Sequence, residues 1–168
     1  TFDPSPDLSP FIKCYWTLES PKEAQPEKQT IVPDGCIELI FPYGDFYKQY
    51  TNNGDHIIQP KCFVIGQLTQ PLEIEATGVT GIFSARFHPN GFWPFATIPI
   101  KEMENTAVPL EKLFGNHASQ LEERILSANA TQDRIHFIEA FLLSKLTETD
   151  TVERIVKSTV ETILAANG

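Results

Sequence analysis

The sequence predicts an α+β fold in which short strands, arranged as a β-barrel or sandwich, are followed by about three helices. Composition changes near residue 109, apolar and polar residues alternate before it, and apolar residues recur at steps of three and four after it. All 13 prolines lie at or before Pro109, with seven of the nine glycines and 15 of the 18 aromatic residues. Proline breaks helix interiors, whereas aromatic and β-branched residues suit strands. Sheets and turns are therefore expected first, and helices second.

The strands of the first part are predicted from alternation of apolar and polar residues, which is the period of a half-buried strand, from a hairpin turn and from a short apolar run. Turn signals separate the alternating segments. Pro33-Asp34-Gly35 precedes one of them, and Asn52-Asn53-Gly54-Asp55 tolerates the positive φ angles of a tight hairpin. Several short strands with turns between them are typical of a barrel or sandwich. The predicted strands cover residues 11–18, 36–41, 46–51, 56–58, 62–65, 72–76 and 79–87.

The helices of the second part are predicted from apolar residues at steps of three and four. The first pattern covers residues 110–125, and Gly115 is a point at which it can split in two. Thr131 is expected to cap a second helix that ends near Leu146. Asp150 is expected to cap a third helix, which is closed by the glycine at residue 168.

The second of these helices has too wide an apolar stripe for one packing partner. Phe137 and Leu143 extend the stripe to about two-thirds of the circumference. The helix is therefore expected to pack on the strands and on another helix, which belongs either to this chain or to a partner. If a partner supplies it, Phe137 and Phe141 are the residues expected at the dimer interface.

Length and charge limit the classes of protein to which the chain can belong. With 168 residues, of which 41% are apolar and 21% charged, it has the composition of a single globular domain. Its 13 basic and 22 acidic residues give a net charge of −9 at pH 7. Affinity for nucleic acids depends on basic side chains that neutralise phosphates. The chain is therefore not expected to hold DNA by itself.

The cysteines and the apolar runs indicate where the chain functions. Cys14, Cys36 and Cys62 are an odd number without C-x-x-C spacing, which suits a reducing compartment. A cytoplasmic location is therefore expected. No apolar run approaches the ~20 residues of a membrane span, and residues 1–4 lack the layout of a signal peptide. No membrane association is expected.

Motifs for metal or cofactor chemistry are missing from the sequence. The four histidines do not pair at metal-ligand spacing, and no H-x-H occurs, so no metal is expected. There is no P-loop and no G-x-G-x-x-G, so no cofactor is expected either, and no G-x-S-x-G, so a nucleophile elbow lacks support. A Cys–His nucleophile pair stays open, because such partners meet in space rather than in sequence. Cys14 and Cys36 are expected to be small core residues.

Two charged residues interrupt otherwise apolar strands and are the main site candidates. Glu38 lies within residues 36–41, and Arg86 within residues 83–87. If both side chains point inward, each needs a partner, because an unpaired buried charge is costly. A salt bridge between them or a polar ligand would supply one; otherwise both face water on the outer surface. Trp16 and Phe87 either line a small-molecule pocket beside them or fill the core.

The connection over residues 86–95 is unusually aromatic. Pro89-Asn90-Gly91 predicts a turn, with Phe87 before it and Phe92, Trp93 and Phe95 after it. These rings are expected to clamp the strands to the helices. A patch that binds a partner protein is the alternative.

Five short motifs occur in order along the chain: Tyr15-Trp16, Pro33-Asp34-Gly35-Cys36-Ile37-Glu38-Leu39-Ile40, Gly66-Gln67, Arg86-Phe87-His88-Pro89-Asn90-Gly91 and Leu113-Phe114-Gly115. This order resembles the uncharacterised amino-terminal domain found in one group of AraC-type transcriptional regulators. The stretch from residue 150 to residue 168 resembles the first helix of the helix-turn-helix region that follows in these proteins.

The resemblance implies a cupin-like β-barrel or jelly roll over residues 1–108, a helical segment packed on it over 109–149, and the start of a truncated helix-turn-helix region over 150–168. It also implies a role in ligand sensing, in dimerisation or in both, without enzymatic activity. A small-molecule effector and a homodimer are the expected partners, and DNA is expected only through a module missing from this chain. The resemblance supplies no ligand-binding residues, so Trp16, Glu38, Arg86 and Phe87 are candidates on physical grounds alone.

Two alternatives to this interpretation remain. A cupin-type enzyme acting on a small molecule would need several ionisable groups in one pocket, and the sequence offers Glu38, Arg86 and His88. A ligand-free interaction module would instead have a solid interior. The residues expected to fill that interior are Trp16, Leu39, Phe41, Phe83 and Phe87.

Overall fold

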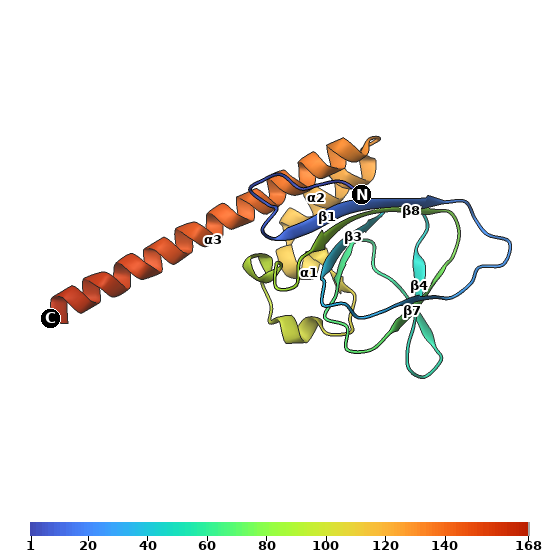
Figure 1. The fold of residues 1–168 in the computed structure, drawn as a ribbon, viewed down its shortest axis with the longest axis horizontal. Helices are drawn as coiled ribbons and strands as arrows, with labels where there is room; N and C mark the ends of the chain where they lie inside the picture. Colours follow the sequence, from blue (N-terminus) through green and yellow to red (C-terminus); the bar gives the residue numbers. More distant parts are fainter. Residues whose placement is uncertain (168) are drawn as a thin grey trace.

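Two antiparallel sheets form the first part of the chain in the computed structural model, which describes the backbone of residues 1–167 and the side chains of residues 1–148 and 162–166 (Figure 1). The larger sheet has the strand order β1-β8-β3-β6-β9, and the smaller sheet β2-β7-β4-β5. Helices follow, so the fold is α+β, as the sequence predicts. The strands are β1 (Ile12–Ser20), β2 (Gln29–Ile31), β3 (Glu38–Pro42), β4 (Tyr47–Tyr50), β5 (His56–Ile58), β6 (Phe63–Ile65), β7 (Leu72–Ala76), β8 (Thr80–Phe87) and β9 (Val108–Pro109).

All seven predicted strands are confirmed, with shifts of a few residues at their ends. The sequence missed β2 and β9, which are three and two residues long. β5 and β6 are as short as β2, but a hairpin turn and an apolar run indicate them, and β2 and β9 lack such signals. In the structure β2 pairs with β7, and β9 pairs with β6.

Two of the predicted turns have the backbone conformation that their glycines allow. Gly54 has φ +83° in the connection between β4 and β5, where the backbone N–H of Thr51 donates to the carbonyl oxygen of Asp55 over 2.8 Å. Gly35 has φ +78° in the loop before β3. Left-handed φ angles are strained for residues with a Cβ atom, which explains glycine at both positions.

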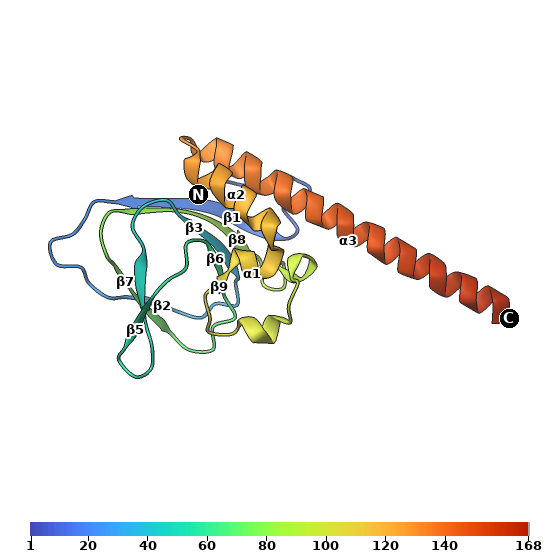
Figure 2. The same cartoon turned by 180° about the vertical axis from the view of Figure 1, so that it is seen from behind.

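The five-stranded sheet is covered on both faces, by the helices on one side and by the four-stranded sheet on the other (Figures 1 and 2). Side chains alternate between the two faces along each strand. On β3, Leu39 and Phe41 belong to the main core beneath the helices. Ile40 lies between them in sequence and packs instead with Tyr47 of the other sheet. One sheet therefore separates two apolar layers.

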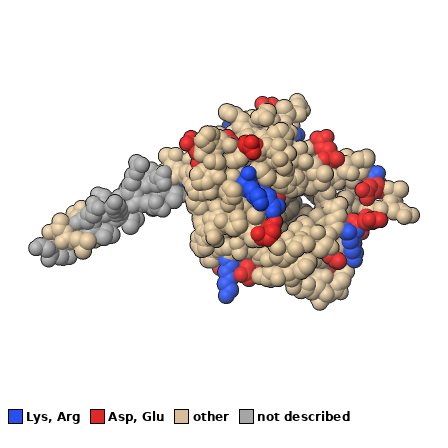
Figure 3. All heavy atoms as spheres, in the orientation of Figure 1, with Lys and Arg blue, Asp and Glu red and all other residues tan. Residues whose placement is uncertain are grey.

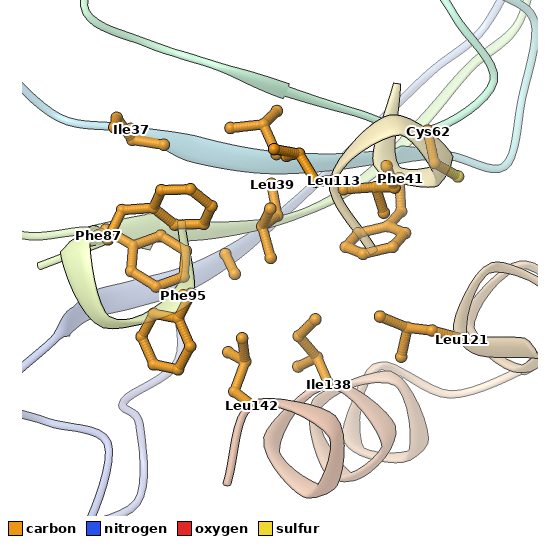
Figure 4. Packing of buried hydrophobic residues seen from close by; sticks show 14 of the residues in the cluster. Ile37, Leu39, Phe41, Cys62, Phe87, Phe95, Leu113, Leu121, Ile138 and Leu142 are labelled. Atoms are coloured by element: carbon orange, nitrogen blue, oxygen red, sulfur yellow. The ribbon is translucent and has the colours of Figure 1, made fainter. Parts of the chain in front are cut away.

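The main core fills the layer between the larger sheet and the helices, where side chains from both sides interdigitate (Figure 4). Leu39 and Phe87 reach it from the strands, and Ile138 and Leu142 from the facing helix. All four are fully buried. Burying a side chain of this size stabilises the fold by about 2 kcal/mol, so this layer holds sheet and helices together.

Most of the aromatic connection over residues 86–95 belongs to this core, as predicted. Phe87, Phe92 and Phe95 are buried and form a ring cluster, with 5.1 Å between the centroids of Phe87 and Phe92 and 5.6 Å between those of Phe87 and Phe95. Phe95 closes a short 3₁₀ helix, η1 (Trp93–Phe95). Trp93 differs from the prediction, because 61% of it is exposed. A second 3₁₀ helix, η2 (Ile100–Met103), leads on to β9.

Three α-helices follow β9 within the described residues: α1 (Leu110–Phe114), α2 (Asn116–Ser127) and α3 (Thr131–Asn167). Gly115 separates the first two with φ +59°, so the split predicted there is confirmed. The break predicted at Asp150 is wrong, because α3 is one helix of 37 residues.

The polar residues around position 150 explain why α3 continues. Threonine and aspartate lower helix propensity by only a few tenths of a kcal/mol each, and neither removes a backbone donor as proline does. Thr147 bonds within the helix, from its hydroxyl to the carbonyl oxygen of Leu143 over 3.1 Å. At about 1.5 Å per residue the helix is about 55 Å long, and its far end extends beyond the rest of the molecule (Figure 1).

Two polar side chains of α3 anchor it to the rest of the fold. Arg134 is buried and donates to the carbonyl oxygens of Ile125 over 3.2 Å and Ala128 over 2.7 Å, at the end of α2. Its guanidinium also lies 4.0 Å from the ring centroid of Tyr43. Glu139 accepts a hydrogen bond from the hydroxyl of Tyr15 on β1 over 3.1 Å. Burial, and then this carboxylate, raises the pKa of Tyr15.

Within the described residues, no helix combines the length and apolarity needed to cross a membrane. On the face seen in Figure 3, acidic side chains are spread among the basic ones, and no continuous basic surface forms on the part that the structure describes. This distribution agrees with the net charge of −9. It provides no electrostatic footprint for nucleic acid on that face.

Candidate ligand-binding site

A cavity of about 130 Å³ lies between the two sheets. Residues of β1, β3, β6 and β8 form one wall, residues of β2, β4 and β7 form the other, and the loop over residues 32–36 lies along it. The lining is mostly apolar. It consists of Trp16, Ile31, Val32, Asp34, Gly35, Cys36, Glu38, Ile40, Tyr47, Gln59, Phe63, Ile65, Gly66, Leu68, Ile74, Ile82 and Arg86.

Strand alternation places the charged side chains in this cavity. On β3, Glu38 and Ile40 line it, while Leu39 between them faces the helices. On β8, Ile82 and Arg86 line it in the same way. The two charged residues thus occupy the face that points to the smaller sheet, where the cavity lies.

Glu38 on β3 accepts hydrogen bonds from one side chain of β1 and two side chains of the adjacent strand β8. Its Oε1 accepts from Nη1 of Arg86 over 2.8 Å, and its Oε2 from Nε1 of Trp16 over 2.9 Å and from Oγ of Ser84 over 2.8 Å. The Glu38 side chain is only 16% exposed. The three hydrogen bonds replace the hydration that the carboxylate loses on burial. An isolated carboxylate at this position would have no such compensation.

Asp34 joins the cluster from the loop. Its Oδ2 accepts from Nη2 of Arg86, and its Oδ1 accepts from the backbone N–H of Cys36 over 3.0 Å. The second bond closes an Asx turn, which holds the loop conformation that begins at Gly35. Arg86 therefore links Glu38 on β3 to Asp34 in the loop before β3.

The opposite charges of this cluster stabilise the ionised forms of Asp34 and Arg86. Partial burial alone would raise the pKa of Asp34, but the Cys36 N–H and the Arg86 guanidinium outweigh it, so this pKa lies below its usual value. Partial burial alone would lower the pKa of Arg86, but Glu38 and then Asp34 outweigh it and raise this pKa. The site thus holds two carboxylates around one guanidinium.

Away from the charged cluster, the polar residues of the lining bond to neighbours. The hydroxyl groups of Tyr47 and Thr80 lie 3.1 Å apart, and Nε2 of Gln59 donates to Oε1 of Gln49 over 3.2 Å. Gln49, Gln59 and Thr80 are buried, so these bonds satisfy groups that water does not reach. The rest of the cavity wall is left predominantly apolar.

Three of the four ligand-binding candidates from the sequence meet in this cavity: Trp16, Glu38 and Arg86. The prediction for Phe87 is not supported, because its side chain is fully buried in the main core on the other face of β8. Asp34 was missed as a site residue. Its Pro-Asp-Gly context signals a turn, but no local pattern shows that β8 supplies its partner.

The residues expected to give a solid interior do not occupy it. Leu39, Phe41, Phe83 and Phe87 belong to the core beneath the helices. Of the five proposed residues, only Trp16 lines the space between the sheets. The reason is that both faces of the larger sheet are apolar, so the sequence does not reveal which face points inward.

The groups proposed for an enzyme converge only in part. Glu38 and Arg86 meet, but His88 is not among the lining residues and its Nε2 lies 3.2 Å from the carbonyl oxygen of Ser9. In the part of the chain that the structure describes, no three His, Cys, Asp or Glu side chains cluster as metal ligands would. The arrangement can bind a molecule through carboxylates, an indole ring and apolar contacts.

The two residues predicted for a dimer interface lie beside a groove between α2 and α3. Phe137 and Phe141 are partly buried and pack against the main core. Phe141 contacts Phe114 edge to face, with 5.1 Å between the two ring centroids. Nζ of Lys145 lies 5.4 Å from the centroid of the Phe141 ring. Part of the wide apolar stripe of α3 is thus covered by this chain itself.

Comparison with known families and proteins adds one finding. A family described as a domain of unknown function, DUF6597, matches residues 1–109, which include both sheets. No curated protein matches the chain.

Proposed function

Because the chain belongs to the DUF6597 family, whose function is unknown, we propose its role from its own structure: a ligand-sensing and dimerisation domain of an AraC-type transcriptional regulator. The observation that carries this proposal is the cavity between the sheets, with a charged cluster in its wall. A mostly apolar cleft or cavity with a few convergent polar groups is the usual form of a small-molecule site.

We further propose that the two sheets form a cupin-like jelly roll. Two antiparallel sheets that face each other around a ligand-sized space support this assignment. The ordered motifs that resemble the amino-terminal domains of AraC-type regulators support it as well, because these domains are cupin-like. Residues 1–108 would then be the sensing module. Residues 109–149 would be the helical segment whose position depends on the conformation of that module.

The larger sheet supplies a physical route from ligand to helices. On β3, Glu38 lines the cavity, and the next residue, Leu39, contacts the core shared with α3. On β8, Arg86 and Phe87 are related in the same way. A ligand that prefers one arrangement of these strands shifts the population of helix positions by its difference in affinity.

A second copy of this chain is the proposed partner of the helical segment. Phe137 and Phe141 are not completely covered by their own chain, and both lie on α3. In this proposal α3 carries the state of the sensing module towards a DNA-binding module outside this chain. A symmetric pair would let two such modules read two half-sites. The acidic net charge fits a division in which the basic surface is elsewhere, and such a regulator works in the cytoplasm.

The experiment that tests this function fills the cavity in the complete natural protein. Ile74 lines the cavity, so Ile74→Phe reduces its volume without touching the charged cluster. A promoter fused to a reporter should then change its output by at least about threefold, because one state of the sensing module is favoured. The matched control is Ile57→Phe on β5, since 49% of Ile57 is exposed and it does not line the cavity. Unchanged output in both variants would contradict the proposal.

A further inference from the structure

We propose that the cavity recognises a small apolar amine, a molecule of about one six-membered ring that carries a single primary ammonium group. This inference rests on the proposed sensing function and names its ligand class. Three independent features of the described residues support it: the volume, the balance of charges and the indole ring of Trp16.

The volume sets the size of the ligand. The cavity holds about 130 Å³. An apolar cavity of about 150 Å³ accommodates benzene, so a single ring is near the upper limit here. Isoleucines from five strands and Phe63 form much of the wall, and such surfaces bind an apolar body rather than a hydrated one.

The balance of charges favours a cation over an anion. Asp34, Glu38 and Arg86 are the charged residues among those that line the cavity in the described chain. Two carboxylates outnumber one guanidinium, which leaves a surplus of one negative charge. Both carboxylates already bond to Arg86. A carboxylate or phosphate ligand would have to displace one of them to reach the guanidinium, whereas an ammonium group can donate to oxygens that still have free lone pairs.

Trp16 adds a preference for positive charge. Its Nε1 donates to Oε2 of Glu38, which fixes the orientation of the indole ring in the cavity wall. The face of an indole attracts cations through the negative charge of its π system. Carboxylates beside an aromatic ring are therefore complementary to an ammonium group.

A sugar or another polyol fits these residues less well. Each buried hydroxyl group of a ligand needs a hydrogen-bond partner. Tyr47 and Gln59 are the uncharged polar side chains that reach the cavity from outside the cluster and its loop. Tyr47 already bonds to Thr80, and Gln59 already bonds to Gln49. The polar capacity that remains is concentrated at the carboxylates, which matches a ligand with one donor group.

The test compares three probes of equal ring size, namely benzylamine, benzyl alcohol and benzoate, by NMR titration of the chain labelled with nitrogen-15. Benzylamine should bind at least about tenfold more tightly than benzoate, with benzyl alcohol between them, because like charges oppose binding. The resonances that shift should include the indole N–H of Trp16.

Two variants show whether the charged cluster causes the preference. Asp34→Asn removes the surplus charge at an exposed rim position and should lower the ratio of benzylamine to benzoate affinity by at least about threefold. Asp55→Asn is the matched control, since Asp55 is an exposed acidic residue in the hairpin of β4 and β5, away from the cavity. It should leave the ratio unchanged.

Each remaining outcome overturns the ligand class. Benzoate binding as tightly as benzylamine would exclude a cation site, and equal effects of the two Asn variants would exclude the cluster as the cause. Failure of all three probes to bind would exclude ring-sized ligands. None of these results decides the sensing function, which depends on the reporter response of Ile74→Phe.

Discussion

Arg86 lies directly opposite Glu38 in the register of β8 and β3, and its Nη1 donates to Oε1 of Glu38 over 2.8 Å. Opposite charges paired across two strands typically stabilise a sheet by less than about 1 kcal/mol when they are exposed. Here Glu38 is largely buried, and Trp16, Ser84 and Asp34 extend the pair into a network. Removing one member leaves the others without compensation, so the network is expected to be worth more than the isolated pair.

Replacing Glu38 by alanine should therefore destabilise the protein by about 2 kcal/mol, because buried Ser84 loses its acceptor and partly buried Arg86 keeps only Asp34. The control is Glu73→Ala, whose partner Lys28 is 4.0 Å away, with both side chains 51% exposed. That change should cost less than about 0.5 kcal/mol. Urea unfolding followed by circular dichroism measures both losses. Equal losses would mean that the cavity cluster does not act as a buried network.

Acidification should weaken the contact between Asp34 and Arg86. The pKa of Asp34 is lowered in the folded state from its usual 3.8, so this carboxylate stabilises the fold above that pH. The contribution is lost as the pH falls through the lower, folded-state pKa. Asp34→Asn should thus reduce the melting temperature near neutral pH, and the difference from the wild type should narrow below about pH 3.8. A difference that does not change with pH would contradict this assignment. Added salt should also narrow the difference in melting temperature between Asp34→Asn and the wild type, because Asp34 is half exposed and its charge is screened.

The loop before β3 should depend on glycine at position 35. Gly35 has φ +78°, and a Cβ atom there would meet only Cγ of Pro89 at 4.0 Å, so conformational strain is the main cost of a side chain. Gly35→Ala should lower the free energy of unfolding by about 1 kcal/mol. Gly35→Asn should lose less, since asparagine tolerates the left-handed region. If both variants unfold at the wild-type urea concentration, the loop adopts another conformation in solution.

Arg134 should be required for the packing of α2 against α3. Arg134→Met keeps much of the apolar stem but leaves the carbonyl oxygens of Ile125 and Ala128 without this donor. The expected loss is about 2 kcal/mol in thermal or urea unfolding. Arg124→Met, at an exposed position on α2, should lose only a few tenths of a kcal/mol. A comparable loss for both would show that the buried contacts of Arg134 contribute little.

The dimer proposal predicts an effect of Phe137 on association. Phe137→Ala should weaken self-association by at least about fivefold in sedimentation velocity, because aromatic residues dominate the affinity of interfaces. Ile57→Ala, on the distant strand β5, should leave the dimer unchanged. A wild-type chain that sediments as a monomer at all concentrations would refute the proposal for this chain.

Much of the fold could be predicted because its signals are local. Alternation identified β1, β3 and β8, and the glycines at positions 35, 54 and 115 have the positive φ angles that a turn or helix break uses. The break expected at Asp150 was wrong for a local reason as well. Polar, β-branched residues reduce helix propensity, but they do not interrupt the hydrogen bonds of a helix.

The candidate site could be predicted only in part. Glu38 and Arg86 stood out because charged residues are rare inside apolar strands, and the structure pairs them. Asp34 and the cavity itself could not be inferred, because the partner of Asp34 lies on a strand about 50 residues later in the sequence. Phe87 was offered as an aromatic residue that either lines a pocket or fills the core, and the structure places it in the core, because adjacent residues on a strand such as Arg86 and Phe87 point to opposite faces.

The sequence by itself therefore determined most of the segments that become strands and helices, since turns, alternation and helical periodicity depend on neighbours in the chain. Only the tertiary structure decided which face of the five-stranded sheet meets the helices and which encloses the cavity. Both faces carry apolar residues because both are covered, so alternation separates the two sets of side chains without saying where each set goes. Which set faces the helices and which faces the cavity depends on the packing of α3 against one side of the sheet and of the smaller sheet against the other.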